Sequence, residues 1–134
     1  MSAAGSGTFD NEDATDWLEE FNSDPVTAIT SALSDVAELD AGDYVDATAA
    51  AYALAAAEFV AAARTEDMGR LPKSAIKTFK DSIDEINEAG LAASARKAVT
   101  RVLKHSELKD AHADGDDGQD WLDDVGELLE GLKG

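Results

Sequence analysis

The chain has 134 residues, with 29 acidic side chains, 11 basic side chains and no cysteine, so its net charge is −18. At this length we expect one domain, 1–134, with a hydrophobic core of its own. The absence of cysteine excludes a disulfide framework, thiol catalysis and thiolate-bound metal centres. Nucleic acid and anionic membranes are not expected as partners, because phosphate contacts need clustered Lys and Arg.

The charges are segregated along the chain. Residues 1–63 hold 13 acidic side chains and no basic one, whereas residues 64–109 hold ten basic and seven acidic ones. The last 25 residues hold nine acidic side chains and one lysine. A fold that packs the middle third between the outer thirds would neutralise many charges internally and leave the excess acid at the surface.

The first eight residues contain no Lys or Arg and no apolar run, so no secretory signal is visible and we expect a cytoplasmic protein. Residues 1–8 are expected to form a flexible or loosely packed segment. The one long apolar stretch, residues 47–63, is mostly alanine and contains Glu58. It is too short and too weakly hydrophobic to predict a membrane span.

The composition predicts an all-α fold, because 26 residues are alanine, two are proline, and apolar residues recur at spacings of three and four. We expect a single-domain bundle of five to seven helices around a long, alanine-rich central helix. Strands have almost no support in the pattern.

The first two helices are expected at about 10–22 and 25–39. Asp10 is placed to cap the first helix, and Phe9 to pack on Ala14 as a hydrophobic staple. Pro25 fits the first position of the second helix. The apolar residues expected to be buried are Ala14, Trp17, Leu18 and Phe21 in the first helix, and Val26, Ile29, Leu33 and Val36 in the second.

The central helix is expected at 44–64, about 30 Å long at 1.5 Å per residue. Its alanines would let neighbouring helices approach closely, while larger side chains supply bulk at Tyr52, Leu54, Phe59 and Val60.

Three further helices are predicted in the second half. Pro72 fits the first position of a fourth helix that Gly90 ends, and a fifth helix covers 92–104, with a short continuation through 106–108. A polar loop at 113–120 precedes a final amphipathic helix from Trp121. The apolar residues of these helices are Ile76, Phe79, Ile83 and Ile86; Ala95, Ala98, Val99, Val102 and Leu103; and Trp121, Leu122, Val125, Leu128, Leu129 and Leu132.

Two clusters resemble metal sites without matching their spacing. Aligning Gly115 with the sixth position of an EF-hand loop places His112 at position 3 and Trp121 where a bidentate Glu is required. His105 and His112 are seven residues apart, whereas a helical two-histidine site needs a spacing of four. We therefore expect no metal and no cofactor.

Glu58 is the carboxylate that most invites a functional interpretation. Its neighbours at three and four positions are alanine and leucine, so its own helix offers no basic partner. It is either exposed or paired across helices, for which Arg96 and Arg101 are candidates. A functional carboxylate is the alternative.

No catalytic motif is visible. Gly5-x-Gly7 lacks the preceding strand and following lysine of a phosphate loop, and no nucleophile elbow is present. We expect a protein that is not an enzyme.

The opening Gly5-Ser6-Gly7-Thr8-Phe9-Asp10-Asn11 resembles the start of a bacterial family, the domain-of-unknown-function 4259 family. Its members typically begin Met-Gly-x-Trp-Gly-x-Gly-x-Phe-(Asp/Glu)-Asn-Asp. Further matching segments are Ala57-Glu58-Phe59-Val60-Ala61-Ala62, Leu71-Pro72, Ser106-Glu107-Leu108 and Trp121-Leu122. The sequence departs from the family at Ser2 and Ala4, where Gly and Trp are usual. The resemblance agrees with an all-helical fold and implies no mechanism.

Three functions remain as hypotheses. The first is a non-catalytic, immunity-like or inhibitor-like module whose acidic surface meets a basic partner protein. The second is halophilic adaptation, in which the 18 aspartates keep a high-salt surface hydrated. The third is a small-ligand binder or enzyme that uses Glu58 with residues around Phe9, Asp10, Asn11 and Trp17. A homo-oligomer remains an open alternative. The candidate binding residues are Phe9, Asp10, Asn11, Asp13, Trp17 and Glu58.

Overall fold

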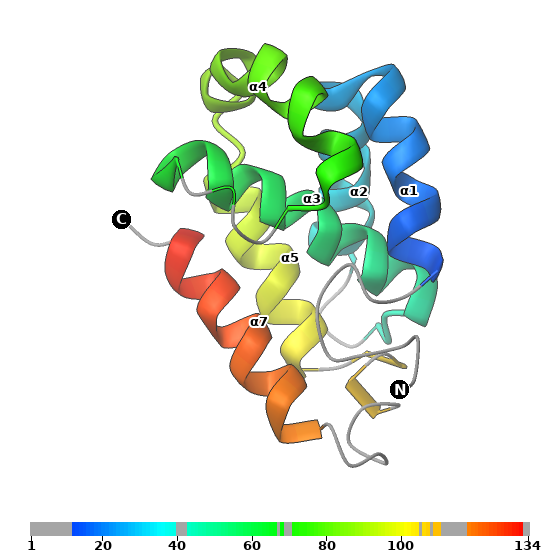
Figure 1. The fold of residues 1–134 in the computed structure, drawn as a ribbon. Coiled ribbons are helices and arrows are strands. Elements are labelled where there is room, and N and C mark those ends of the chain that lie inside the picture. Colours follow the sequence, from blue (N-terminus) through cyan, green and yellow to red (C-terminus); the bar gives the residue numbers. More distant parts are fainter. Residues whose placement is uncertain are drawn as a thin grey trace.

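The computed structural model describes residues 12–39, 43–66, 68, 71–104, 106–107, 109–110 and 118–132. These ranges hold six helices, and the fold is an all-α bundle around a central helix (Figure 1). The helices are α1 (Glu12–Ser23), α2 (Pro25–Ala37), α3 (Ala47–Thr65), α4 (Lys73–Glu88), α5 (Ala92–Lys104) and α7 (Gly118–Leu132). Within the described ranges, extended pairing is confined to one isolated parallel bridge between Val45 and Ser106.

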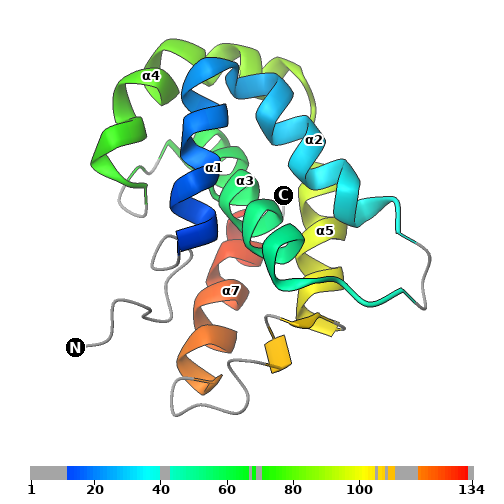
Figure 2. The same ribbon diagram turned by 90° about the vertical axis from the view of Figure 1, so that its right-hand side faces the viewer.

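Helix α3 is the centre of the bundle, as the alanine content predicts. Thirteen of its 19 residues are buried, and each of the other five helices packs against it. A helix that is apolar all round must be covered on every side. Figure 2 shows α3 between α1 and α2 on one side and α7 on the other. The approach of α7 is close, since a Cβ built on Gly131 would lie 3.4 Å from the Cβ of Ala61.

The buried faces of α1, α2 and α5 largely confirm the predicted patterns. The predicted stripe of α1 is buried throughout, at Ala14, Trp17, Leu18 and Phe21. In α2, Val26 is only partly buried and alanines complete the inward face. Helix α5 has the predicted bounds, and Leu103 alone of its predicted inward residues is only partly buried.

Four details of the prediction are wrong. Helix α3 begins at Ala47 rather than Tyr44, because Asp46 is its N-cap. Pro72 is the N-cap of α4 rather than its first residue, with an extended ψ of 144°. Helix α2 ends at Ala37, two residues early. Helix α7 begins at Gly118, within the predicted loop.

Leu122 also departs from the prediction, since its side chain is 40% exposed. Helix α7 buries Trp121, Val125, Leu128 and Leu132, which recur at three and four positions. Leu122 is one residue beyond Trp121, which turns its side chain about 100° away from that stripe.

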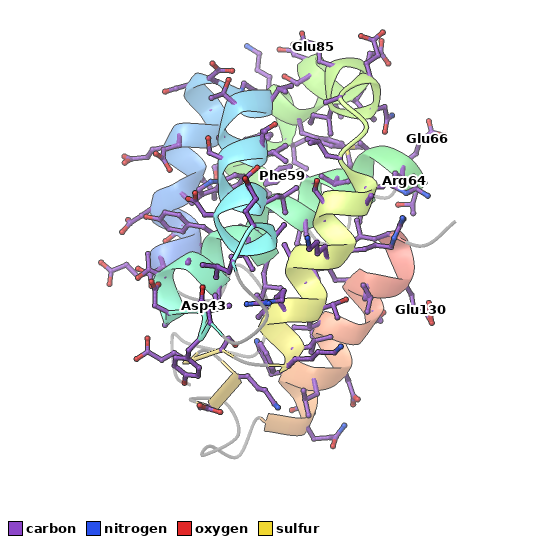
Figure 3. The ribbon with its side chains drawn as sticks, turned by 180° about the vertical axis from the view of Figure 1, so that it is seen from behind. Asp43, Phe59, Arg64, Glu66, Glu85 and Glu130 are labelled. Carbon is purple, nitrogen blue, oxygen red and sulfur yellow. The ribbon has the colours of Figure 1, made fainter. Side chains whose placement is uncertain are left out.

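An aromatic cluster joins three helices in the core. The rings of Phe59 in α3 and Phe21 in α1 stack with centroids 3.9 Å apart. Trp17 and Phe79 each lie 5.9 Å from Phe59 between ring centroids. Figure 3 shows Phe59 in the interior, whereas Arg64 and Glu66 lie at the edge of the molecule. This cluster fixes α1 and α4 against α3.

Candidate functional site

Helices α1 and α2 form a tight corner around Asp24. The backbone N–H of Asp24 donates to the Glu20 carbonyl at 3.0 Å, and its own carbonyl accepts from Ala28 N–H at 2.9 Å. Pro25 occupies the first turn of α2, where the missing N–H costs no helical hydrogen bond. The chain therefore leaves α1 and enters α2 with one residue between them, and the two helices diverge from that point (Figure 2).

A groove of about 520 Å³ lies between these two helices. Its lining residues are Trp17, Glu19, Glu20, Ser23, Asp24, Thr27, Ala28, Ser31, Ala32 and Asp35, with Tyr52 contributed by α3. Trp17, Ala28 and Ala32 are buried and form the floor, whereas the four carboxylates are exposed. We call this the α1–α2 groove.

The α1–α2 groove is strongly acidic. None of the described residues that line it is basic, and the chain contains no Lys or Arg before Arg64. The negative charge affects the pKa of Tyr52. Burial raises this pKa above the ordinary value of 10, and the carboxylates of Glu20, Asp13 and Asp16 raise it further. Negative charge opposes ionisation of the phenol. The groove therefore suits a cationic group.

Two of the sequence candidates, Asp13 and Trp17, lie on α1. Trp17 lines the groove, whereas Asp13 is not one of its lining residues. The hydroxyl of Thr48 donates to Asp13 Oδ2 at 3.3 Å, which joins the start of α1 to α3. Trp17 is 1% exposed and packs in the aromatic cluster. The indole of Trp17 is thus a core side chain as well as part of the groove floor.

Glu58 lies elsewhere. It is 2% exposed, which removes the exposed alternative, and it lines a cavity of about 180 Å³ between α3 and α7. The other wall of that cavity includes Glu127 and Gly131. The structure does not bring Glu58 and Trp17 into one site, although the third hypothesis combines them.

The remaining candidates, Phe9, Asp10 and Asn11, lie outside the described residues. The same holds for His105, His112 and the acidic stretch 111–117. Of the residues that line the groove, sequence reasoning named only Trp17 as a candidate, and those that it missed include Glu20, Asp35 and Tyr52. The sequence feature that could have indicated the groove is the absence of Lys and Arg from the polar faces of α1 and α2.

Comparison with protein-family models gives one match, to the domain of unknown function (DUF4259), over residues 2–124. The chain belongs to this family. Comparisons with curated proteins and with solved structures give no match.

In this DUF4259 protein, none of the described helices has both the length and the apolar character needed to cross a bilayer. Among the same described residues, no group of three or more His, Asp or Glu side chains is arranged to hold a metal ion. The α1–α2 groove is larger than the cavity that Glu58 lines, and four carboxylates line it, compared with two in that cavity.

Proposed function

We propose that this DUF4259 protein is a non-catalytic binding module, and that its α1–α2 groove receives a basic segment of a partner protein. The observation that carries the proposal is the groove itself. Four exposed carboxylates surround an apolar and aromatic floor, and none of the described residues that line the groove is a cation.

The groove combines two interactions that favour Arg or Lys. Carboxylates such as Glu20 and Asp35 can pair with a cation, and Tyr52 provides an aromatic ring beside them. An exposed ion pair contributes only about 0.2–1 kcal/mol, so charge alone gives weak binding. A cation held against an aromatic ring adds about 0.5–2 kcal/mol, depending on its desolvation. Several such contacts support an Arg-rich or Lys-rich segment as the ligand.

The segregated charge also favours fast association. Residues 1–63 carry a charge of −13, and they include both helices of the groove. A surface of one sign steers an oppositely charged partner and can raise the association rate well above that of a neutral pair.

The Glu58 cavity supports a small-ligand function less well. Its volume of about 180 Å³ is below the roughly 300–1,000 Å³ that is typical of ligand pockets. The halophilic hypothesis accounts for the total charge but not for a concave acidic groove on an aromatic floor.

The test is affinity capture from the native host at low salt, with bound proteins identified by mass spectrometry. The wild type is compared with a groove variant, Glu20→Gln with Asp35→Asn, and with a control, Asp81→Asn with Asp84→Asn on α4. All four side chains are exposed, so both variants lose the same charge at surface positions.

We expect a basic partner that is captured by the wild type and the control, released by salt, and lost from the groove variant. Equal loss from both variants would show binding to net charge instead of the groove. An empty capture by the wild type would reject the partner hypothesis.

A further inference from the structure

A second groove, on the outer face of α5, carries the opposite charge. Its volume is about 420 Å³, and five of its six lining residues belong to α5, with Leu129 contributed by α7. The five are Arg96, Lys97, Thr100, Arg101 and Lys104. We call this the α5 groove; α5 and α7 lie side by side in Figures 1 and 2.

Five of the six side chains that line the α5 groove can donate hydrogen bonds. It holds four cationic side chains and one hydroxyl, and no carboxylate and no aromatic ring lines it among the described residues, in a chain with 29 acidic side chains. Lysine and arginine side chains donate hydrogen bonds and accept none. A groove lined in this way matches a ligand that offers only acceptor oxygens, which is an oxyanion.

The two arginines are held in place by backbone carbonyls. Arg96 Nη1 donates to the Leu132 carbonyl at 2.9 Å, and Arg101 Nη2 donates to the Asp43 carbonyl at 3.1 Å. A carbonyl is neutral, so the hydrogen bond from Arg96 positions its guanidinium without cancelling its charge. Positioning side chains before binding lowers the entropy cost of binding a ligand.

The spacing along α5 indicates the length of the ligand. Lys97, Arg101 and Lys104 follow one another at about one helical turn, and the first and last are about 10 Å apart along the axis at 1.5 Å per residue. One tetrahedral anion sits best against one or two of these groups, whereas a chain of linked phosphates can contact them all. Without an aromatic ring in the lining there is no platform for base stacking.

We propose that the α5 groove binds an oligophosphate, recognised through its phosphate oxygens by Arg96, Lys97, Arg101 and Lys104. The oligophosphate is either an inorganic chain or the phosphate tail of a free nucleotide. The net charge of −18 does not prevent this, because charges more than about 8 Å away are largely screened at physiological ionic strength.

The test is isothermal titration calorimetry of the full chain in buffer without divalent cations. The probes are orthophosphate, pyrophosphate, tripolyphosphate and ATP. Lys97→Gln with Lys104→Gln is the groove variant, and Lys73→Gln with Lys77→Gln on α4 is its control. None of the four lysines is buried, so each variant changes the charge by the same amount without opening the core.

We expect affinity to rise with the number of phosphates. Tripolyphosphate should bind the groove variant about tenfold or more weakly than the wild type, since each charge-assisted hydrogen bond is a large part of the binding energy. The control should stay within about twofold of the wild type, as expected for distant exposed charges.

Three results would overturn the proposal: no binding of tripolyphosphate, equal affinity for orthophosphate and tripolyphosphate, or equal weakening in both variants. The titration with ATP distinguishes a nucleotide from an inorganic phosphate chain. Affinity for ATP equal to or above that for tripolyphosphate supports a nucleotide, and much lower affinity supports an inorganic chain. Neither outcome depends on the partner of the α1–α2 groove.

Discussion

Two carboxylates from distant parts of the chain cap the N-terminus of α3. Asp46 Oδ1 accepts a hydrogen bond from Ala49 N–H at 2.8 Å, and Glu107 Oε1 accepts one from Ala47 N–H at 2.9 Å. The first N–H groups of a helix have no partner within the helix, and negative charge is favourable there. Glu107 therefore holds the segment after α5 against the start of the central helix.

The Asp46 cap predicts a loss of stability on truncation. Asp46→Ala should lower the free energy of unfolding by about 1 kcal/mol, because an N-cap side chain of this kind contributes about that amount. Asp46→Asn keeps an acceptor oxygen and should retain most of the stability. Urea unfolding at neutral pH, followed by circular dichroism, measures both variants. Equal stability of wild type and Asp46→Ala would contradict a capping role.

Tyr44 predicts a dependence on alkaline pH. The hydrogen bond that its hydroxyl donates to Asp110 raises the pKa of Tyr44 to about 12, with smaller contributions from desolvation and from the charges of Asp110 and Glu107. The folded state thus favours the protonated phenol. The resulting stabilisation is complete below pH 10, the ordinary pKa, and is lost as the pH rises to about 12.

The measurement compares wild type with Tyr44→Phe across that range. Wild type should lose stability more steeply than the variant between pH 10 and about 12, since only wild type carries the hydroxyl that ionises. Parallel pH profiles would show that the hydrogen bond to Asp110 contributes nothing.

The glycines in and after the helices have different structural roles. Gly126 lies inside α7, and a Cβ built there would meet nothing within 4 Å. Gly90 follows the C-cap of α4 with a φ of +63°, in the left-handed region, and its N–H donates to the Asn87 carbonyl at 3.2 Å. Gly126 is therefore replaceable, whereas Gly90 allows the chain to turn after α4.

The same substitution should have opposite effects at these two glycines. Gly126→Ala should raise the free energy of unfolding by about 0.5–1 kcal/mol, because alanine is the better helix former. Gly90→Ala should lower it by about 1–2 kcal/mol, the cost of an alanine in the left-handed region. Thermal and urea unfolding of the two variants tests both signs. A loss at Gly126 or a gain at Gly90 would contradict the assigned roles.

Phe59 connects three helices of the core. It is fully buried on the central helix and contacts rings from both α1 and α4. Phe59→Ala should cost about 3–5 kcal/mol, because it removes a buried ring and leaves a cavity. This is a large share of the roughly 5–15 kcal/mol that stabilises a small protein. Phe59→Leu, measured alongside in urea, should lose less, and a loss below about 1 kcal/mol for Phe59→Ala would contradict the central role of the cluster.

The net charge of −18 predicts an effect of salt on the whole fold. Added KCl should raise the free energy of unfolding, because it screens repulsion among acidic side chains that the compact state brings together. Urea unfolding from dilute buffer to molar KCl measures the dependence. Unchanged stability across that range would remove the halophilic hypothesis. It would leave the two groove proposals untouched.

The helices and most of their buried faces follow from the local pattern of the sequence. Helix formation depends on neighbours three and four residues away, so the apolar stripe of α1 and the bounds of α5 could be predicted from local spacing. The alanine-rich composition of 47–63 likewise predicted a central helix, since only a helix covered on all sides is apolar all round.

The positions of the grooves, and the residues that line each of them, depend instead on how the helices pack against one another. The α1–α2 groove combines Glu20 and Asp35 with Tyr52 of a third helix, and the Glu107 cap lies 60 residues from Ala47. Such contacts depend on crossing angles and on the path between helices, which local periodicity does not encode. For the same reason, the sequence could not show that Glu58 and Trp17 face different cavities. The two residues lie on different helices, and the cavity that each side chain faces depends on how those helices pack.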